Sequence, residues 1–145
     1  MILKNGEILL IHIPRTGGTT AEKILGFNRH DTWREPQFDI LFGAARGAML
    51  QHLTYQQIVK REIIDLESII IITIIRNPIY RAYSLFLYFK KYKQFDKFLN
   101  FLEEGGINRY FYQPQYKFLI NENNELIKCN YAVSYTHLRA HETRH

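Results

Sequence analysis

Two apolar runs of strand length stand out along the chain, and each ends near a proline. The first, Glu7 to Ile13, is broken only by His12 and stops at Pro14, which cannot donate to a sheet ladder. The second, Ser68 to Ile75, is rich in β-branched residues and stops before Pro78. Continuous apolar runs of this length are typical of strands buried on both faces of a parallel sheet. The pattern therefore predicts two parallel core strands.

Each run is followed by a signal for the start of a helix. Thr19 and Thr20 offer hydroxyl groups at the cap of a helix predicted to continue through Leu25. Asn77 and Pro78 suit the cap and the first turn of a second helix. Both strands are therefore predicted to lead directly into helices.

Three further elements are predicted from local signals. Thr54 and Gln57 form a capping box, which predicts a helix that runs to about Glu62. Phe95 to Glu104 has apolar residues at helical spacing and is predicted as a short amphipathic helix. Glu125 to Tyr131 is predicted as a strand that follows a turn.

Two segments show no clear periodicity. Residues 27–49 are interrupted by one proline and two glycines, and they are predicted to form a long connection of the kind that is often functional. Residues 108–119 interleave tyrosines with basic residues, a pattern that would suit base stacking, but no nucleic-acid recognition motif accompanies them. They are interpreted as core and loop packing. No site residue is assigned in either segment.

The composition is that of a globular protein of one domain. The chain has 145 residues, of which 46% are hydrophobic and 23% charged, so disorder is not expected. A net charge of +5 suits an anionic ligand without identifying it. The single cysteine, Cys129, excludes an internal disulfide and a cysteine-based metal site. No run approaches the roughly 20 apolar residues of a membrane helix, and no secretion signal is visible, so a soluble protein is predicted.

The turn after the first strand has the chemistry of an anion site. Two adjacent glycines allow positive φ and the close approach of backbone N–H groups to a ligand, and a helix begins directly afterwards. A nucleotide-triphosphatase loop would need Gly-x-x-x-x-Gly-Lys-Ser/Thr, which is absent because the basic residue precedes the glycines. The residues predicted to form the anion cradle are Arg15, Thr16, Gly17, Gly18, Thr19 and Thr20.

The second strand ends in another arrangement of polar residues. Arg76 lies at its carboxyl end, and Ser84 lies about two turns into the following helix. An arginine fork together with a serine hydroxyl suits the recognition of one phosphomonoester. The alternative is an arginine that caps a neighbouring helix and a serine that is buried in packing.

Both junctions resemble motifs of the carbohydrate-type sulfotransferases, which use 3′-phosphoadenosine 5′-phosphosulfate. HIPRTGGTT, from His12 to Thr20, is similar to the family's HIPKTGGTS loop. Arg76 to Phe86 matches every fixed position of the family's pattern R-[DN]-P-x-x-R-x-x-S-x-[FY], and Gln51 to Ile58 resembles its HLTxxxI region. The resemblance covers roughly residues 7–131. It implies a three-layer, P-loop-like α/β fold with a parallel central sheet flanked by helices, and with the C-terminal part missing.

The resemblance also implies roles for individual residues. The cradle backbone and the Arg15 side chain would hold the 5′-phosphosulfate, while Arg76 and Ser84 would hold the 3′-phosphate. A hydroxyl of a carbohydrate or related acceptor would attack sulfur in line, and adenosine 3′,5′-bisphosphate would leave. His52 is the candidate general base, and the alternative is a histidine that only hydrogen-bonds a helix end. No metal is implied, because a fixed cation can stand where kinases use magnesium.

Three basic side chains near these motifs need separate interpretation. Arg15 departs from the family pattern, which usually has lysine at that position. Arginine keeps the positive charge but is a very poor proton donor, so electrostatic stabilisation is expected of it and protonation of the leaving oxygen is not. His12 is interpreted as a core residue that supports the phosphate loop, and His30 as a solvated residue.

The chain beyond Ala132 does not continue the preceding pattern. SYTHLRAHE, at residues 134–142, resembles the translation of a transposase adapter used in sequencing libraries. Residues 133–145 are therefore interpreted as a non-native tail, and residues 1–132 as a partial sulfotransferase domain. Three histidines in this tail have the spacing of zinc ligands on one helix face, but they are not interpreted as a metal site: His137, His141 and His145.

Two other functions remain open at the level of the sequence. A nucleotide-binding phosphotransferase could use the same cradle, but it is disfavoured by the missing lysine-serine pair and by the lack of a recognisable magnesium-binding carboxylate after a strand. A non-catalytic, basic nucleic-acid-binding module would leave the strand-end motifs without a purpose. No nucleic-acid or membrane partner is therefore predicted. A cytoplasmic location is expected, although members of the family are often membrane-anchored.

Overall fold

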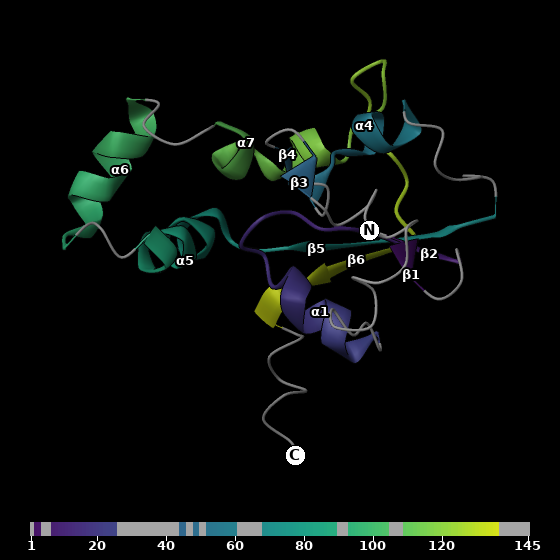
Figure 1. The fold of residues 1–145 in the computed structure, drawn as a ribbon, viewed down its shortest axis with the longest axis horizontal. Helices are drawn as coiled ribbons and strands as arrows, with labels where there is room; N and C mark the ends of the chain where they lie inside the picture. Colours follow the sequence, from purple (N-terminus) through teal and green to yellow (C-terminus); the bar gives the residue numbers. More distant parts are fainter. Residues whose placement is uncertain are drawn as a thin grey trace.

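A computed structural model gives the structure of the protein, and its elements surround one central sheet (Figure 1). The predicted connection at 27–49 is described only in part, and His30 and the tail histidines lie outside the described residues. None of the helices in the described ranges is both long and apolar enough to cross a membrane. The structure describes residues 2–3, 7–25, 44–45, 48–49, 52–60, 68–89, 93–104 and 109–136.

The sheet has the strand order β1-β2-β5-β6. The strands β2 (Ile8–Ile11), β5 (Ile70–Ile75) and β6 (Tyr131–Ser134) are parallel, which confirms the two predicted core strands and their direction. The structure adds an antiparallel edge strand, β1 (Ile2–Leu3), that the pattern did not predict. β1 pairs antiparallel with β2 because few residues separate them in sequence, and parallel strands need a much longer crossover connection.

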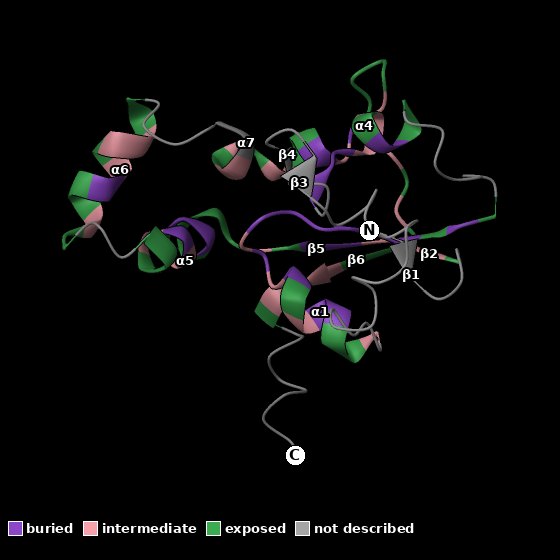
Figure 2. Cartoon of the chain, in the orientation of Figure 1, coloured by how far each residue is buried: buried purple, intermediate pink, exposed green. Residues whose placement is uncertain are grey.

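The residues of β2 alternate between two hydrophobic clusters. Leu9 and Ile11 belong to a cluster with Ile58 of helix α4 (Tyr55–Val59), whereas Leu10 packs with Ala21 of helix α1 (Gly18–Ile24). Figure 1 shows α1 on one side of the sheet and α4 on the other, and Figure 2 shows the buried residues concentrated between them. Both faces of β2 are therefore covered, as the uninterrupted apolar run predicted.

A third cluster joins the next two helices. Leu85 of α5 (Pro78–Phe89) and Phe98 of α6 (Phe95–Glu103) are both buried in this contact. The rings of Phe86 and Phe95 meet edge to face with centroids 5.5 Å apart, a geometry that adds stability beyond the buried area. The remaining described elements are β3 (Ala44–Ala45), β4 (Ala48–Met49), α7 (Arg109–Tyr112) and a 3₁₀ turn (Gln115–Phe118).

Two of the predicted helix starts are confirmed by their hydrogen bonds. The Thr54 hydroxyl accepts from the Gln57 backbone N–H at 3.3 Å, and the Gln57 side chain accepts from the Thr54 backbone N–H at 3.0 Å, which is the predicted capping box. Asn77 Oδ1 accepts from two backbone N–H groups in the first turn of α5, those of Ile79 and Tyr80. Local sequence is sufficient for these caps, because donor and acceptor lie within three residues of each other.

Two local predictions were wrong. The N-cap of α1 is Gly17, with no side-chain cap, so Thr19 and Thr20 lie in the first turn and not at the cap. The predicted strand from Glu125 to Tyr131 is absent: this stretch has an isolated antiparallel bridge between Leu126 and Ile120, and β6 begins at Tyr131. Just before β6, the Ile71 backbone N–H donates to the Asn130 side chain at 2.8 Å, and the Asn130 backbone N–H donates to the Ile71 backbone oxygen at 2.9 Å. β6 therefore crosses the predicted boundary between residues 132 and 133.

The Arg81 side chain connects α5 to two other segments, the turn after β2 and residues 111–113. It is buried, and its guanidinium donates to the carbonyl oxygens of Pro14, Phe111 and Gln113, each at 2.9 Å. Burial lowers the pKa of Arg81 to about 10, so the group stays charged at neutral pH. Since carbonyl oxygens are its acceptors, this arginine positions the chain around the first turn.

We predict that Arg81→Lys destabilises the protein by roughly 2–4 kcal/mol, because an ammonium cannot reach all three carbonyl oxygens in the geometry of the fork. Urea unfolding at constant m-value measures the change. The reverse substitution at an exposed site on α6, Lys97→Arg, is the control and should change stability by less than about 0.5 kcal/mol. Equal effects in the two variants would contradict the role of the three hydrogen bonds.

Candidate functional site

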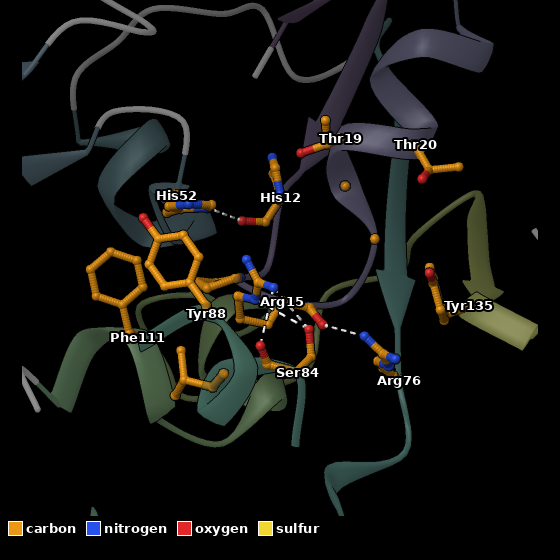
Figure 3. A pocket seen from close by; sticks show the side chains of 14 residues that line it. His12, Arg15, Thr19, Thr20, His52, Arg76, Ser84, Tyr88, Phe111 and Tyr135 are labelled. Carbon is orange, nitrogen blue, oxygen red and sulfur yellow. Dashed lines mark hydrogen bonds between the residues drawn. The ribbon is translucent and has the colours of Figure 1, made fainter. Parts of the chain in front are cut away.

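The loops that follow β2 and β5 lie side by side at one edge of the sheet. Parallel pairing aligns Leu10 with Ile72 and Ile11 with Thr73, so both strands deliver their carboxyl ends to the same edge. There the Arg76 guanidinium donates to the backbone oxygen of Arg15 at 3.3 Å. A cavity of about 380 Å³ opens between these loops and α5 (Figure 3). The structure thus brings the two motifs, 61 residues apart in sequence, to one cavity.

The first loop reverses the chain within four residues. Arg15 has φ 66° and Gly17 has φ 102°, and only glycine adopts the second value without strain. The Thr16 hydroxyl is buried and donates to the Ile13 backbone oxygen at 2.9 Å, which closes the turn from inside. Gly18 is needed for a different reason, because a Cβ there would lie 2.1 Å from the His12 ring. The two glycines therefore serve backbone conformation and close packing, respectively.

The Arg15 side chain crosses the cavity to reach α5. Its guanidinium donates to Ser84 Oγ at 3.0 and 3.2 Å and to the Ser84 backbone oxygen at 3.1 Å, and it lies 4.7 Å from the Tyr88 ring centroid. Burial lowers the pKa of Arg15, and the nearby charge of Arg76 lowers it further, against an opposing effect of Tyr88. Two guanidinium groups in one partly desolvated cavity leave positive charge that an anion would neutralise.

The Arg76 side chain lies on the opposite wall of the cavity (Figure 3). Its guanidinium carbon lies 4.3 Å from the centroid of the Tyr135 ring. Its backbone is fixed by Gln115, which accepts from the Arg76 N–H at 2.9 Å and donates to its backbone oxygen at 2.7 Å. We expected Arg76 to share a ligand with Ser84, but the hydrogen bonds that the structure gives Ser84 come from Arg15.

His52 lies in the same cavity, two residues before the N-cap of α4, as expected. It is buried, and its Nδ1 lies 2.9 Å from the backbone oxygen of His12. Because a carbonyl oxygen only accepts, Nδ1 must carry the hydrogen, and in the neutral ring Nε2 is the basic nitrogen. The ring also meets Phe111 edge to face, with centroids 5.8 Å apart. The hydrogen bond from His52 Nδ1 goes to the residue after β2 and not to a helix end, and the ring lines the cavity.

Several residues that line the cavity were not predicted. Thr19, Thr20 and both glycines line it as expected, but so do Tyr88, Phe111 and Tyr135. Tyr88 could have been found from its spacing, because it follows Ser84 by one helical turn on the same face of α5. Phe111 and Tyr135 could not, because only the tertiary fold brings their segments to this edge. Tyr135 falls within the predicted tail and lies against Gly17.

No cluster of three or more histidine, cysteine or carboxylate side chains suited to a metal ion is present in the described ranges. The cysteine of the chain, Cys129, is half-buried, and burial raises the pKa of its thiol. The guanidinium groups of Arg15 and Arg76 line the cavity and bring positive charge to it.

We predict that Gly18→Ala destabilises the protein by roughly 1–3 kcal/mol, because the new methyl group overlaps the His12 ring. Thermal unfolding measures the change. The loss should be smaller when His12→Ala is also present, since the smaller side chain leaves room for the methyl group, and a double-mutant cycle reports this coupling. Lys23→Ala, at an exposed position of the same helix, is the control. Strict additivity of the two substitutions would contradict the contact.

Comparison with known proteins gives no relative from which to transfer a function. No protein-family model, curated protein or solved structure matches the chain. The interpretation of the cavity therefore depends on its own residues and on the motif resemblance described above.

Proposed function

We propose that the chain is the donor-binding part of a sulfotransferase, which transfers a sulfuryl group from 3′-phosphoadenosine 5′-phosphosulfate to a hydroxyl of a carbohydrate or related acceptor. The observation that carries the proposal is the convergence of Arg15 and Arg76, from two strand-end loops, on one cavity beside a glycine turn. In this proposal residues 1–132 are a partial sulfotransferase domain with a three-layer, P-loop-like fold. The covered faces of the parallel strands support that fold.

The chemistry of the cavity suits a donor with phosphate groups at two positions. The first loop has a left-handed glycine beside the start of a helix, which suits close approach of an anionic oxygen to backbone N–H groups. Arg76 lines the same cavity at the end of β5, where its guanidinium N–H groups suit hydrogen bonds to a phosphate. We assign the 5′-phosphosulfate to the loop from Arg15 to Thr20 and the 3′-phosphate to Arg76 and Ser84.

The transfer step needs no metal in this proposal. The acceptor oxygen forms a bond to sulfur while the bond from sulfur to the oxygen of the 5′-phosphate breaks, and adenosine 3′,5′-bisphosphate leaves. The acceptor's proton passes to Nε2 of His52, whose Nδ1–H is held by the His12 carbonyl. Arg15 stabilises the charge that develops on the leaving oxygen and donates no proton to it. Its present bonds to Ser84 keep the guanidinium beside the loop.

We predict that the chain binds adenosine 3′,5′-bisphosphate more tightly than ADP with magnesium, measured by calorimetry. Arg76→Gln should weaken binding of the bisphosphate at least about tenfold and change binding of 5′-AMP little, because AMP lacks the 3′-phosphate. Lys97→Gln, on the exposed side of α6, is the control. Tighter binding of ADP with magnesium would favour a phosphotransferase and overturn the assignment.

We predict that His52→Asn lowers sulfuryl transfer about 100-fold or more, while the affinity for adenosine 3′,5′-bisphosphate stays within about threefold. Asparagine can place an amide N–H near the position of Nδ1, so the bond to the His12 carbonyl can persist while the base is lost. Transfer of labelled sulfate to a panel of hydroxyl acceptors measures the rate. Retention of full activity in this variant would remove His52 from the mechanism.

A further inference from the structure

A buried carboxylate lies directly beneath the first loop. Glu22 of α1 is 1% exposed, and its Oε1 lies 2.7 Å from Nδ1 of His12, which is 5% exposed. Burial of a carboxylate is strongly unfavourable unless a hydrogen-bond donor or an opposite charge is close. The two atoms at 2.7 Å need a hydrogen on one of them, and we place it on Nδ1 of His12; the contact is close but is not aligned as a hydrogen bond. Nothing in the pattern of residues indicates this pair, since Glu22 falls inside an ordinary helix.

The ring that Glu22 holds is packed against the phosphate loop. A Cβ built on Gly18 would lie 2.1–2.5 Å from three atoms of the His12 ring, so the ring occupies the space beside that glycine. His12 also lines the cavity (Figure 3). The orientation of this ring therefore determines how far the backbone of Gly18 can move inward.

The same residue supports His52 in two ways. Its backbone oxygen lies 2.9 Å from His52 Nδ1, and the two imidazole rings meet edge to face at 80° with centroids 4.6 Å apart. The first contact sets which nitrogen of His52 is protonated, and the second sets the plane of its ring. Both contacts depend on the place of one residue, His12.

We propose that Glu22 and His12 form a positioning pair for the site, in which the Glu22 carboxylate fixes the His12 ring and the fixed ring holds Gly18 and His52 in place. The chain of contacts runs from Glu22 Oε1 to His12 Nδ1 and from the His12 ring to the two neighbours. Neither residue needs to touch the reacting atoms. The consequence for transfer rests on the proposed function, because a misplaced base or loop slows the reaction more than it weakens binding.

Two substitutions of similar volume at residue 22 separate positioning from simple packing. Glu22→Gln keeps an oxygen that can accept from His12 Nδ1, whereas Glu22→Met fills the space without any acceptor. We expect Gln to keep the kcat of transfer within about threefold of the original chain, and Met to lower kcat at least about tenfold while the KM for the donor changes less than about threefold. Similar rates in the two variants would show that residue 22 only fills volume.

A spectroscopic measurement on the full chain tests the pair without any substrate. Long-range ¹H–¹⁵N spectra distinguish the nitrogens of histidine rings, and substitution of His12 and His52 in turn assigns their signals. We expect Nδ1 of both rings to be protonated, and we expect Glu22→Met to shift the His52 signals while Glu22→Gln preserves them. Glu103→Met, at an exposed position of α6, is the control and should shift neither.

The outcomes of these measurements are distinguishable. An unprotonated Nδ1 in His12 of the original chain would overturn the pair, and this result needs no variant that folds. Unchanged His52 signals in a folded Glu22→Met variant would also overturn it. Absence of transfer by the original chain would instead count against the sulfotransferase, and the spectra would still decide whether Glu22 positions the two histidines.

Discussion

The parallel pairing of β2 with β5 is the constraint on which the rest of the structure depends. It sets Leu10 beside Ile72, so the two loops that follow must leave the sheet at the same edge. Side chains on both faces of these strands are buried, which fixes the register because a slip by one residue would turn the core outward. The pairing of β2 with β5 therefore determines the position of the site, and the polar groups determine its chemistry.

Positive charge is the second organising feature of this edge. Arg15, Arg76 and Arg81 each donate to a backbone oxygen of another segment, so their side chains connect the loops at this edge. Their roles differ by depth. Arg81 is buried among carbonyl oxygens, whereas Arg15 and Arg76 line the cavity beside aromatic rings. Arg81 stabilises the fold, and Arg15 and Arg76 line the cavity.

The sequence was a good guide wherever a feature depends on neighbours in the chain. The apolar runs predicted both core strands, the Thr54 capping box was correct, and the paired glycines marked the sharp turn. Features that depend on distant segments were missed. The three acceptors of Arg81, the start of β6 at Tyr131 and the contact between Arg15 and Ser84 arise only after folding, because their partners are fixed by topology and not by spacing.

The contact between Gly18 and His12 ties together residues on two different elements. The ring fills the space that any side chain at residue 18 would require, and its Nδ1 lies 2.7 Å from Oε1 of the buried Glu22. A bulkier residue at 18 would displace the imidazole and disrupt its contact with the Glu22 carboxyl group. Positions 12, 18 and 22 are therefore expected to change together during divergence, so that their joint substitution pattern in homologous chains would record this packing.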